Sequence, residues 1–172
     1  KEVNEKSNRV HSVEDVVKSS IMIKDQGFEL GIQTMIGLPG DSFEKSINTA
    51  KKVVEIAPDI VRIYPTLVIK GTYLEELYNM GQYTPLSVED AVDLCAMLME
   101  IYENNDINVI RVGLQPTDTI SDGGDVIAGP FHPAIRQLVD SKLAQKQIEE
   151  LIIKNNLTEK ETLTILAEKK DV

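Results

Sequence analysis

Cysteine is nearly absent from this sequence, and Cys95 is the single example. One thiol cannot form a disulfide within the chain. Cys95 lies in an apolar run with helical spacing, so we expect a buried free thiol. The only two histidines, His11 and His132, have no partners at metal-ligand spacing. These residues therefore predict no zinc, iron–sulfur or other metal site in this chain.

Positive charge is also scarce, because 18 Lys and Arg stand against 28 Asp and Glu, for a formal net charge of −10. Nucleic acids and anionic membranes are bound by clustered Lys and Arg, so the composition argues against both partners. No apolar run approaches the roughly 18 residues that would span a bilayer. The charged N-terminus has no signal-peptide core, and we expect a cytoplasmic protein.

The sequence does contain two consecutive strand–loop–helix patterns. Residues 28–36 predict a strand that is apolar on both faces, followed by the turn Gly37-Leu-Pro-Gly40 and a helix that Asp41 would cap. A second strand is predicted over 60–69, with Pro65 at a bulge or at the end of regular pairing. Parallel strands place their following loops at one edge of the sheet, so both turns should meet there.

Capping residues and hydrophobic spacing predict the remaining elements. These are helices over 12–26, 73–79, 87–104 and 133–155, a strand over 108–113, a long loop over 115–133, and a last helix capped at Thr158. The alternation predicts an α/β fold: a partial (β/α) TIM-like barrel with parallel strands, followed by C-terminal helices. We expect the barrel part over 1–115 and a loop plus helical extension over 116–172.

Three parallel strands do not close a barrel. An open wall of this kind should expose strand edges and an apolar face. We expect a missing barrel half, or a second copy of the chain, to cover that face.

The turn at Gly37–Gly40 has three interpretations. A nucleotide phosphate loop would need a Gly-x-x-x-x-Gly-Lys-Ser/Thr run, which the sequence lacks. An ordinary strand-to-helix turn needs no ligand. A cofactor-binding loop at the top of a barrel would use the glycines to let backbone approach a ligand closely.

Three motifs, in this order and spacing, resemble the radical S-adenosylmethionine (radical SAM) enzymes. Gly31–Ser42 is similar to the family's fifth-strand motif, and Tyr64–Thr72 to its sixth-strand motif. Asn8-Arg-Val-His-Ser12 resembles the segment after the fourth strand. The resemblance covers roughly residues 7–115 and is closest to the elongator-catalytic-subunit-like branch, which is related to the oxygen-independent coproporphyrinogen III oxidase group.

The resemblance implies an iron–sulfur oxidoreductase that reductively cleaves S-adenosylmethionine to a 5′-deoxyadenosyl radical. In the family, a Cys-x-x-x-Cys-x-x-Cys loop holds the 4Fe-4S cluster, and this sequence lacks that loop. We therefore expect the C-terminal half of such an enzyme, with S-adenosylmethionine and the cluster in the full-length parent. Neither cofactor is expected on this fragment, which should be inactive alone.

The resemblance also implies residue roles. Arg9 would face the methionine carboxylate, which a guanidinium binds bidentately, although a solvated arginine before a helix fits the same residue. The other implied cofactor contacts are Ile36, Gly37, Val68 and Ile69, for which core packing is the alternative. The implied substrate-facing residues are Gln33, Tyr64 and Thr66, whereas Arg62 fits an ordinary rim charge.

The elongator-like relatives imply a transfer-RNA substrate, and the porphyrin-acting relatives imply a tetrapyrrole. The acidic charge of this chain argues against RNA contact here. A different class of function also fits: a non-catalytic α/β module, derived from the same barrel, that binds a partner or dimerises through its exposed sheet.

Overall fold

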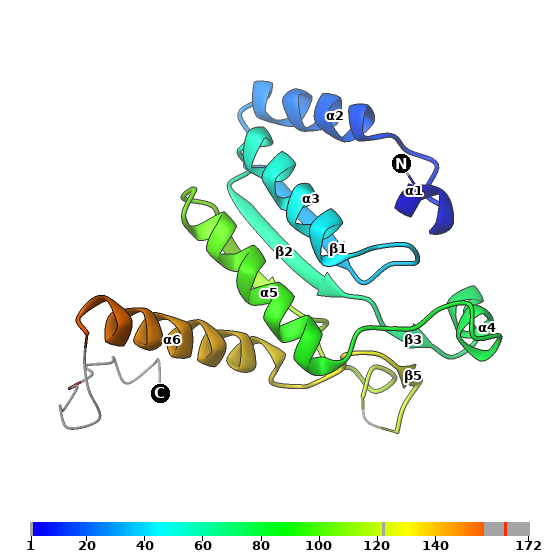
Figure 1. Ribbon diagram of the computed structural model, residues 1–172. Coiled ribbons are helices and arrows are strands. Elements are labelled where there is room, and N and C mark those ends of the chain that lie inside the picture. Colours follow the sequence, from blue (N-terminus) through cyan, green and yellow to red (C-terminus); the bar gives the residue numbers. More distant parts are fainter. Residues whose placement is uncertain (1, 122, 157–163, 165–172) are drawn as a thin grey trace.

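The computed structural model describes residues 2–121, 123–156 and 164. Six helices and five strands are found in that part of the chain (Figure 1). They run in the order α1 (Glu2–Lys6), α2 (Val13–Asp25), β1 (Gly31–Ile36), α3 (Phe43–Ile56), β2 (Ile60–Pro65), β3 (Val68–Ile69), α4 (Tyr73–Asn79), α5 (Val88–Glu103), β4 (Asn108–Val112), β5 (Val126–Ala128) and α6 (Ile135–Lys154). The predicted cap at Thr158 lies outside the described residues.

The main sheet has three parallel strands in the order β1-β2-β4. Gly31 of β1 pairs with Ile60 of β2, and the register continues to Ile36 and Pro65. The predicted side-by-side, same-direction arrangement of these two segments is therefore confirmed. The α/β fold with a parallel sheet is also confirmed, whereas three strands among the described residues do not form a TIM barrel.

The core lies on one face of this sheet. Helices α3 and α5 cross β1 and β2 in Figure 1, and α6 packs beside α5. Alternate strand residues such as Ile36, Val61 and Ile63 point into this layer and are at most 1% exposed. On α5, Cys95 and Tyr102 are fully buried. The predicted buried thiol is confirmed.

The chain after Pro65 leaves the main sheet. Regular pairing ends there, as one of the two interpretations of Pro65 predicts, and β3 then pairs antiparallel with β5. The single strand predicted over 60–69 is therefore wrong at its end. The long loop predicted over 115–133 is also interrupted by β5, which finds its partner far away in sequence.

Local capping also differs from the expectation at two places. Ser42, and not Asp41, caps α3, because its hydroxyl accepts the amide of Lys45. The strand predicted over 28–36 begins only at Gly31, and Phe28 is 68% exposed. The predicted start of the helix over 12–26 is confirmed, because Ser12 and Asp15 bond reciprocally in a capping box at the start of α2.

The uncovered face of the sheet is only partly apolar, because Met35 and Ile60 share it with polar and cationic residues, and this corrects the sequence-based expectation. Polar and cationic side chains, described below, line up across its three strands. The exposed apolar surface lies instead on α2, where Ser20 is the only buried residue. Val13, Val17, Ile21 and Met22 of that helix are 37–60% exposed. None of the helices in the described ranges is long and apolar enough to cross a membrane.

Candidate functional site

The turn after β1 is held by a carboxylate of its own chain. Asp41 Oδ2 accepts the amide of Gly37 at 3.0 Å and the hydroxyl of Ser46 at 2.8 Å. Its Oδ1 accepts the amide of Ser42 at 2.8 Å. Gly37 and Gly40 both have positive φ, at 74° and 78°, which explains glycine at these corners. Asp41 thus organises the turn, although it does not cap the helix.

The other side of Gly37 is also occupied. Its carbonyl accepts the hydroxyl of Tyr83 at 2.5 Å, and a Cβ on Gly37 would lie 3.0 Å from the side chain of Leu86. Burial raises the pKa of Tyr83 to about 12, with a smaller contribution from the charge of Asp41. Both backbone hydrogen-bonding groups of Gly37 are therefore used within the chain, and the approach of its backbone to a ligand stays a prediction.

Ile36 and Thr66 form a clamp between the ends of β1 and β2. The Ile36 side chain is 1% exposed in the core, and its carbonyl accepts both the amide and the hydroxyl of Thr66 at 3.0 and 2.7 Å. Thr66 is itself 4% exposed. The structure therefore gives Ile36 and Thr66 packing and pairing roles, and the ligand contacts implied for them stay predictions.

Val68 and Ile69 belong to the small antiparallel sheet. Val68 is fully buried and pairs with Ala128. The carbonyl of Ile69 accepts the hydroxyl of Thr72 at 2.6 Å. Their backbone groups bond to β5 and to the start of α4, and the cofactor contacts implied for them stay predictions.

Arg9 does lie against the uncovered face of the sheet. Its Nη2 is 3.0 Å from Sδ of Met35, which points away from the core between two buried neighbours in β1. Among the predicted cofactor contacts, Arg9 alone has its functional group on this face.

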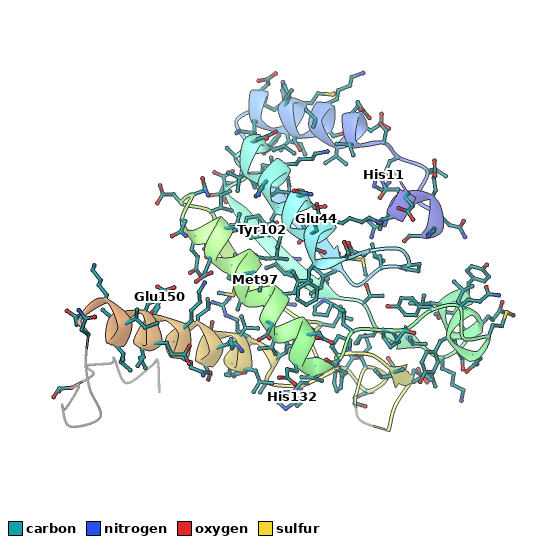
Figure 2. The ribbon with its side chains drawn as sticks, in the orientation of Figure 1. His11, Glu44, Met97, Tyr102, His132 and Glu150 are labelled. Carbon is teal, nitrogen blue, oxygen red and sulfur yellow. The ribbon has the colours of Figure 1, made fainter. Side chains whose placement is uncertain are left out.

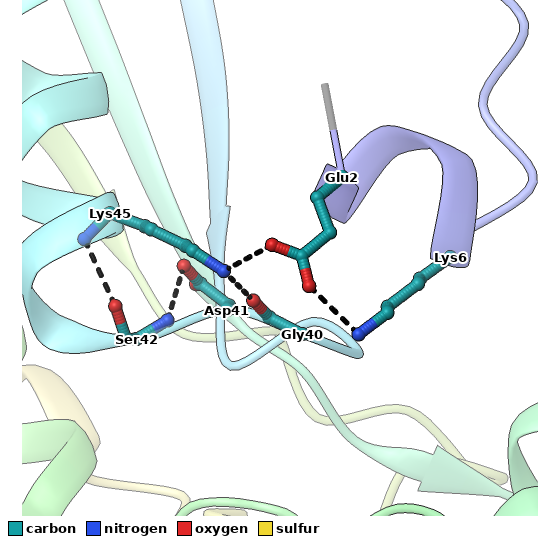
Figure 3. A network of polar contacts seen from close by, with 6 residues as sticks. All are labelled: Glu2, Lys6, Gly40, Asp41, Ser42 and Lys45. Carbon is teal, nitrogen blue, oxygen red and sulfur yellow. Dashed lines mark hydrogen bonds and ion pairs between the residues drawn. The ribbon is translucent and has the colours of Figure 1, made fainter.

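Helix α1 places Arg9 by docking on the glycine turn (Figure 3). Glu2 bridges Lys45 and Lys6, each at 2.9 Å, and Lys45 also donates to the carbonyl of Gly40 at 2.6 Å. The hydrogen bond from Lys45, followed by that from Lys6, lowers the pKa of Glu2 to about 2. An ionic network therefore holds the segment that precedes Arg9.

The uncovered face carries a polar row that crosses all three strands. Gln33 is the register partner of Arg62, and Arg62 is the register partner of Arg111. Tyr64 follows Arg62 on the same face of β2 and pairs with Met35. The predicted open-face placement of Gln33 and Tyr64 is consistent with this geometry, and their contact with a substrate stays a prediction.

Arg62 and Arg111 were missed as site residues. Each looks like an isolated exposed charge along the sequence, and only strand pairing places them side by side. A depression of about 230 Å³ adjoins the row and is lined by Arg62, Gln33 and the strand starts around Gly31 and Ile60.

Comparison with known proteins gives the family. A family model described as the radical SAM C-terminal domain matches residues 58–145. This chain belongs to the radical SAM C-terminal domain family. The matched region begins just before β2 and ends within α6.

The radical SAM chain is similar to curated proteins that include a tRNA uridine acetyltransferase and an Elongator complex protein. It is 36% identical over 103 residues to the tRNA uridine(34) acetyltransferase of Methanocaldococcus jannaschii, which covers 58% of this chain and 19% of that protein. It is 37% identical over 98 residues to Elongator complex protein 3 of Homo sapiens, covering 55% of this chain and 18% of that protein. The chain thus spans less than a fifth of these relatives.

A solved structure resembles the radical SAM chain over most of its length. The archaeal Methanocaldococcus infernus Elp3 with an N-terminal deletion has a TM-score of 0.75 and 28% sequence identity. The alignment covers 85% of this chain and 34% of that one. These relatives bear out the elongator-like resemblance and lend no support to a coproporphyrinogen oxidase.

The radical SAM chain does not fit the family's cluster. Cys95, its only cysteine, is fully buried, and burial raises the pKa of that thiol to about 12. Across the described ranges, no group of three or more His, Cys, Asp or Glu side chains is placed to hold a metal ion. His11 and His132 lie at distant ends of the molecule in Figure 2, and Nδ1 of His132 accepts the amide of Ala134 at 3.1 Å.

Proposed function

We propose that this chain forms the C-terminal wall of a radical SAM iron–sulfur protein of the elongator type. The observation that carries the proposal is the parallel register of β1 and β2, which gathers the Gly37 turn and the end of β2 at one edge. The family match and the solved elongator-type neighbour support the same assignment. Full-length members would use S-adenosylmethionine and a 4Fe-4S cluster. Because the single cysteine of this chain is buried, the proposal places the cluster ligands in a segment outside these 172 residues.

We propose that the uncovered sheet face is the side turned toward the reaction. Arg9, Gln33 and Tyr64 bring hydrogen-bonding groups to it, while the opposite face is filled by the core. Arg9 is the residue best suited to hold a ligand carboxylate, because a guanidinium pairs with a carboxylate through two donors. A transfer-RNA uridine is the proposed substrate, on the strength of the relatives' names.

The proposed partner is the missing N-terminal barrel half, packed against β1 and α2. β1 is an edge strand, since β2 is its only partner in the sheet of the described residues. On α2, Val13, Val17 and Ile21 recur at every fourth position and line an apolar groove of about 390 Å³. An added strand and helix would pair the edge and cover the groove together.

Cofactor cleavage tests the catalytic part of the proposal. The purified 172-residue chain, supplied with iron, sulfide, reductant and S-adenosylmethionine, should release no 5′-deoxyadenosine. A longer form of the polypeptide that carries the three-cysteine loop should release it, and Arg9→Gln in that form should raise KM for S-adenosylmethionine. Release of 5′-deoxyadenosine by the isolated chain would overturn the assignment of the cluster to another segment.

Sedimentation with a matched pair of variants tests the partner surface. Ile21→Gln should weaken association of the chain with a separately expressed N-terminal half, because Ile21 is 54% exposed in the groove. Met97→Gln is the control, since Met97 is 42% exposed on α5, away from the groove (Figure 2). Equal losses in both variants would contradict the proposed surface.

The alternative function is a binding or dimerisation module without catalysis. The exposed apolar groove on α2 is the observation that favours it. In that case the isolated chain should form a dimer that Ile21→Gln dissociates. A homodimer through the open sheet is disfavoured, because it would bring the arginine row against a second copy of itself.

A further inference from the structure

Two arginines stand side by side on the uncovered face of the sheet. Arg62 of β2 and Arg111 of β4 are register partners, despite an irregularity that adds one residue to β4 just before Arg111. Adjacent strands lie about 4.8 Å apart, so the two side chains start from neighbouring positions. Gln33 of β1 extends the row on the other side of Arg62.

Burial shows that both arginines point away from the core. Arg62 stands between Val61 and Ile63, which are both fully buried, so alternation along the strand turns Arg62 to the open face. Arg111 precedes the buried Val112 and is itself exposed. Like charges directly opposite each other on neighbouring strands are destabilising. An anion bound between them would relieve this repulsion.

No carboxylate of the described residues lies within ion-pair distance of this pair. Arg111 donates to Gln115 at 3.2 Å, which is a neutral partner. The chain has four arginines, and Arg9 is also on the open face. The fourth, Arg136, is neutralised by Asp140 at 2.8 Å and sits on α6.

Three of the four arginines thus lie on one face of a protein whose net charge is −10. At physiological ionic strength the Debye length is about 8 Å, so acidic side chains on the helix layer are largely screened from a ligand on this face. Contacts made directly by guanidinium groups are screened much less. The overall acidity therefore does not prevent anion binding at the row.

We propose that the row of Arg62, Arg111 and Gln33 is a binding site for a phosphate group. Two guanidinium groups offer paired donors that match phosphate oxygens, and the Gln33 amide adds a neutral donor beside them. The phosphate is carried either by an RNA strand or by a free nucleotide. The proposal rests on the proposed function, because it assumes that an RNA-type ligand binds at this face. It adds the residues that would bind the phosphate backbone of that ligand.

Fluorescence anisotropy with a labelled single-stranded oligouridylate of about ten nucleotides tests the site on the full 172-residue chain without cofactors. Arg62→Gln and Arg111→Gln should each weaken binding about tenfold or more, since each removes a charge-assisted contact. Each should also lower the slope of log affinity against log salt concentration by about 0.7. Lys51→Gln is the control, because Lys51 is an exposed cation on α3, on the opposite side of the sheet from the row. The affinity of this variant for the oligouridylate should equal that of the native chain.

Arg62→Lys provides a second test of the site if a glutamine variant fails to fold. It retains the charge and loses the paired donors, so binding weaker than that of the native chain with an unchanged salt slope supports the site. Competition separates the two sources: displacement by uridine monophosphate at millimolar concentration assigns the site to a free nucleotide, and displacement only by unlabelled oligomer assigns it to a strand.

Two results would overturn the proposal. One is RNA binding that Arg62→Gln and Arg111→Gln leave unchanged. The other is displacement of the oligomer by poly-glutamate at equal concentration, which would assign the row to protein carboxylates. Neither result depends on cofactor cleavage, so failure here and failure of the proposed function are distinguishable.

Discussion

At the scale of single residues, the environment of Gly37 is set by Asp41 and Tyr83. One binds its amide and the other binds its carbonyl. A glycine at the carboxyl end of a parallel strand is a common place for a ligand to approach. Here the amide and carbonyl of Gly37 are bonded within the chain. The hydrogen-bonding groups available to a ligand are side chains on the open face of the sheet.

Tyr83→Phe should lower the free energy of unfolding by about 1–3 kcal/mol, because it leaves the Gly37 carbonyl without its donor. Tyr102→Phe is the matched comparison. The Tyr102 hydroxyl is buried and makes no hydrogen bond of good geometry among the described residues, although Thr34 lies near enough to lower its pKa slightly against the effect of burial. Its removal should therefore change stability by less than about 1 kcal/mol. Urea denaturation of the three proteins measures both values. A larger loss in Tyr102→Phe than in Tyr83→Phe would contradict this account.

The same two tyrosines predict a loss of stability in alkali. Burial raises the pKa of both to about 12, above the ordinary value of 10. The folded state therefore keeps protons that the unfolded state releases, and stability should fall as pH rises from about 10 to 12. A protein with both tyrosines changed to Phe should show a smaller fall in urea midpoints over that range. An equal fall would show that other groups dominate.

At the scale of elements, α1 and α2 are attached differently from α3, α5 and α6. Helices α3, α5 and α6 surround the core, and their side chains such as Leu94 and Val139 are at most 1% exposed. α1 contributes no buried residue and is held by the ions around Glu2. α2 is joined at its end by Lys24, which donates to carbonyls of Ile56 and Ala57 at the end of α3. These two helices are therefore the elements most open to rearrangement.

Acid or salt should release α1 before the core unfolds. The depressed pKa of Glu2, about 2, means that its contribution is present above 4.5 and is lost as pH falls toward 2. The network is exposed, so high salt should screen it. Amide exchange of Arg9, which donates to the carbonyl of Asn4, should accelerate in Glu2→Gln at neutral pH. Glu55→Gln, on exposed α3 surface, is the control and should leave that amide unchanged.

At the scale of the whole molecule, the sheet has one face closed by helices and one left open. β4 also has a covered edge, because Arg136 of α6 donates to the carbonyl of Val109 at 2.9 Å. The edge of β1 has no such cover in the described part of the chain. The predicted boundary between the barrel part and the C-terminal extension at residue 115 stays a prediction. Two elements of the extension nevertheless contact the barrel part, because β5 pairs with β3 and α6 packs against α5.

Alkylation of Cys95 should report opening of the whole core. The thiol is fully buried, and burial raises its pKa to about 12, so it is protonated and inaccessible at pH 8. Iodoacetamide should react only as fast as the core opens, and the rate should rise steeply near the urea midpoint. Rapid reaction without denaturant would show that α5 detaches from the sheet in the native protein.

Local patterns in the sequence predict much of the fold. Helical spacing and capping residues identify α2, α4 and α5 to within a residue or so, because these signals act within a few positions. The turn at Gly37 follows in the same way, since its backbone needs glycine. Long-range pairing explains the failures: β5 is short and gains its place only from β3.

The candidate site divides along the same line. The sequence by itself determined the two parallel strand units and the family that they indicate, because both are written in adjacent residues. Only the tertiary structure decided which side chains share a surface. Arg62 and Arg111 are distant in sequence, and hydrogen-bonded pairing of β2 with β4 makes them neighbours on the open face.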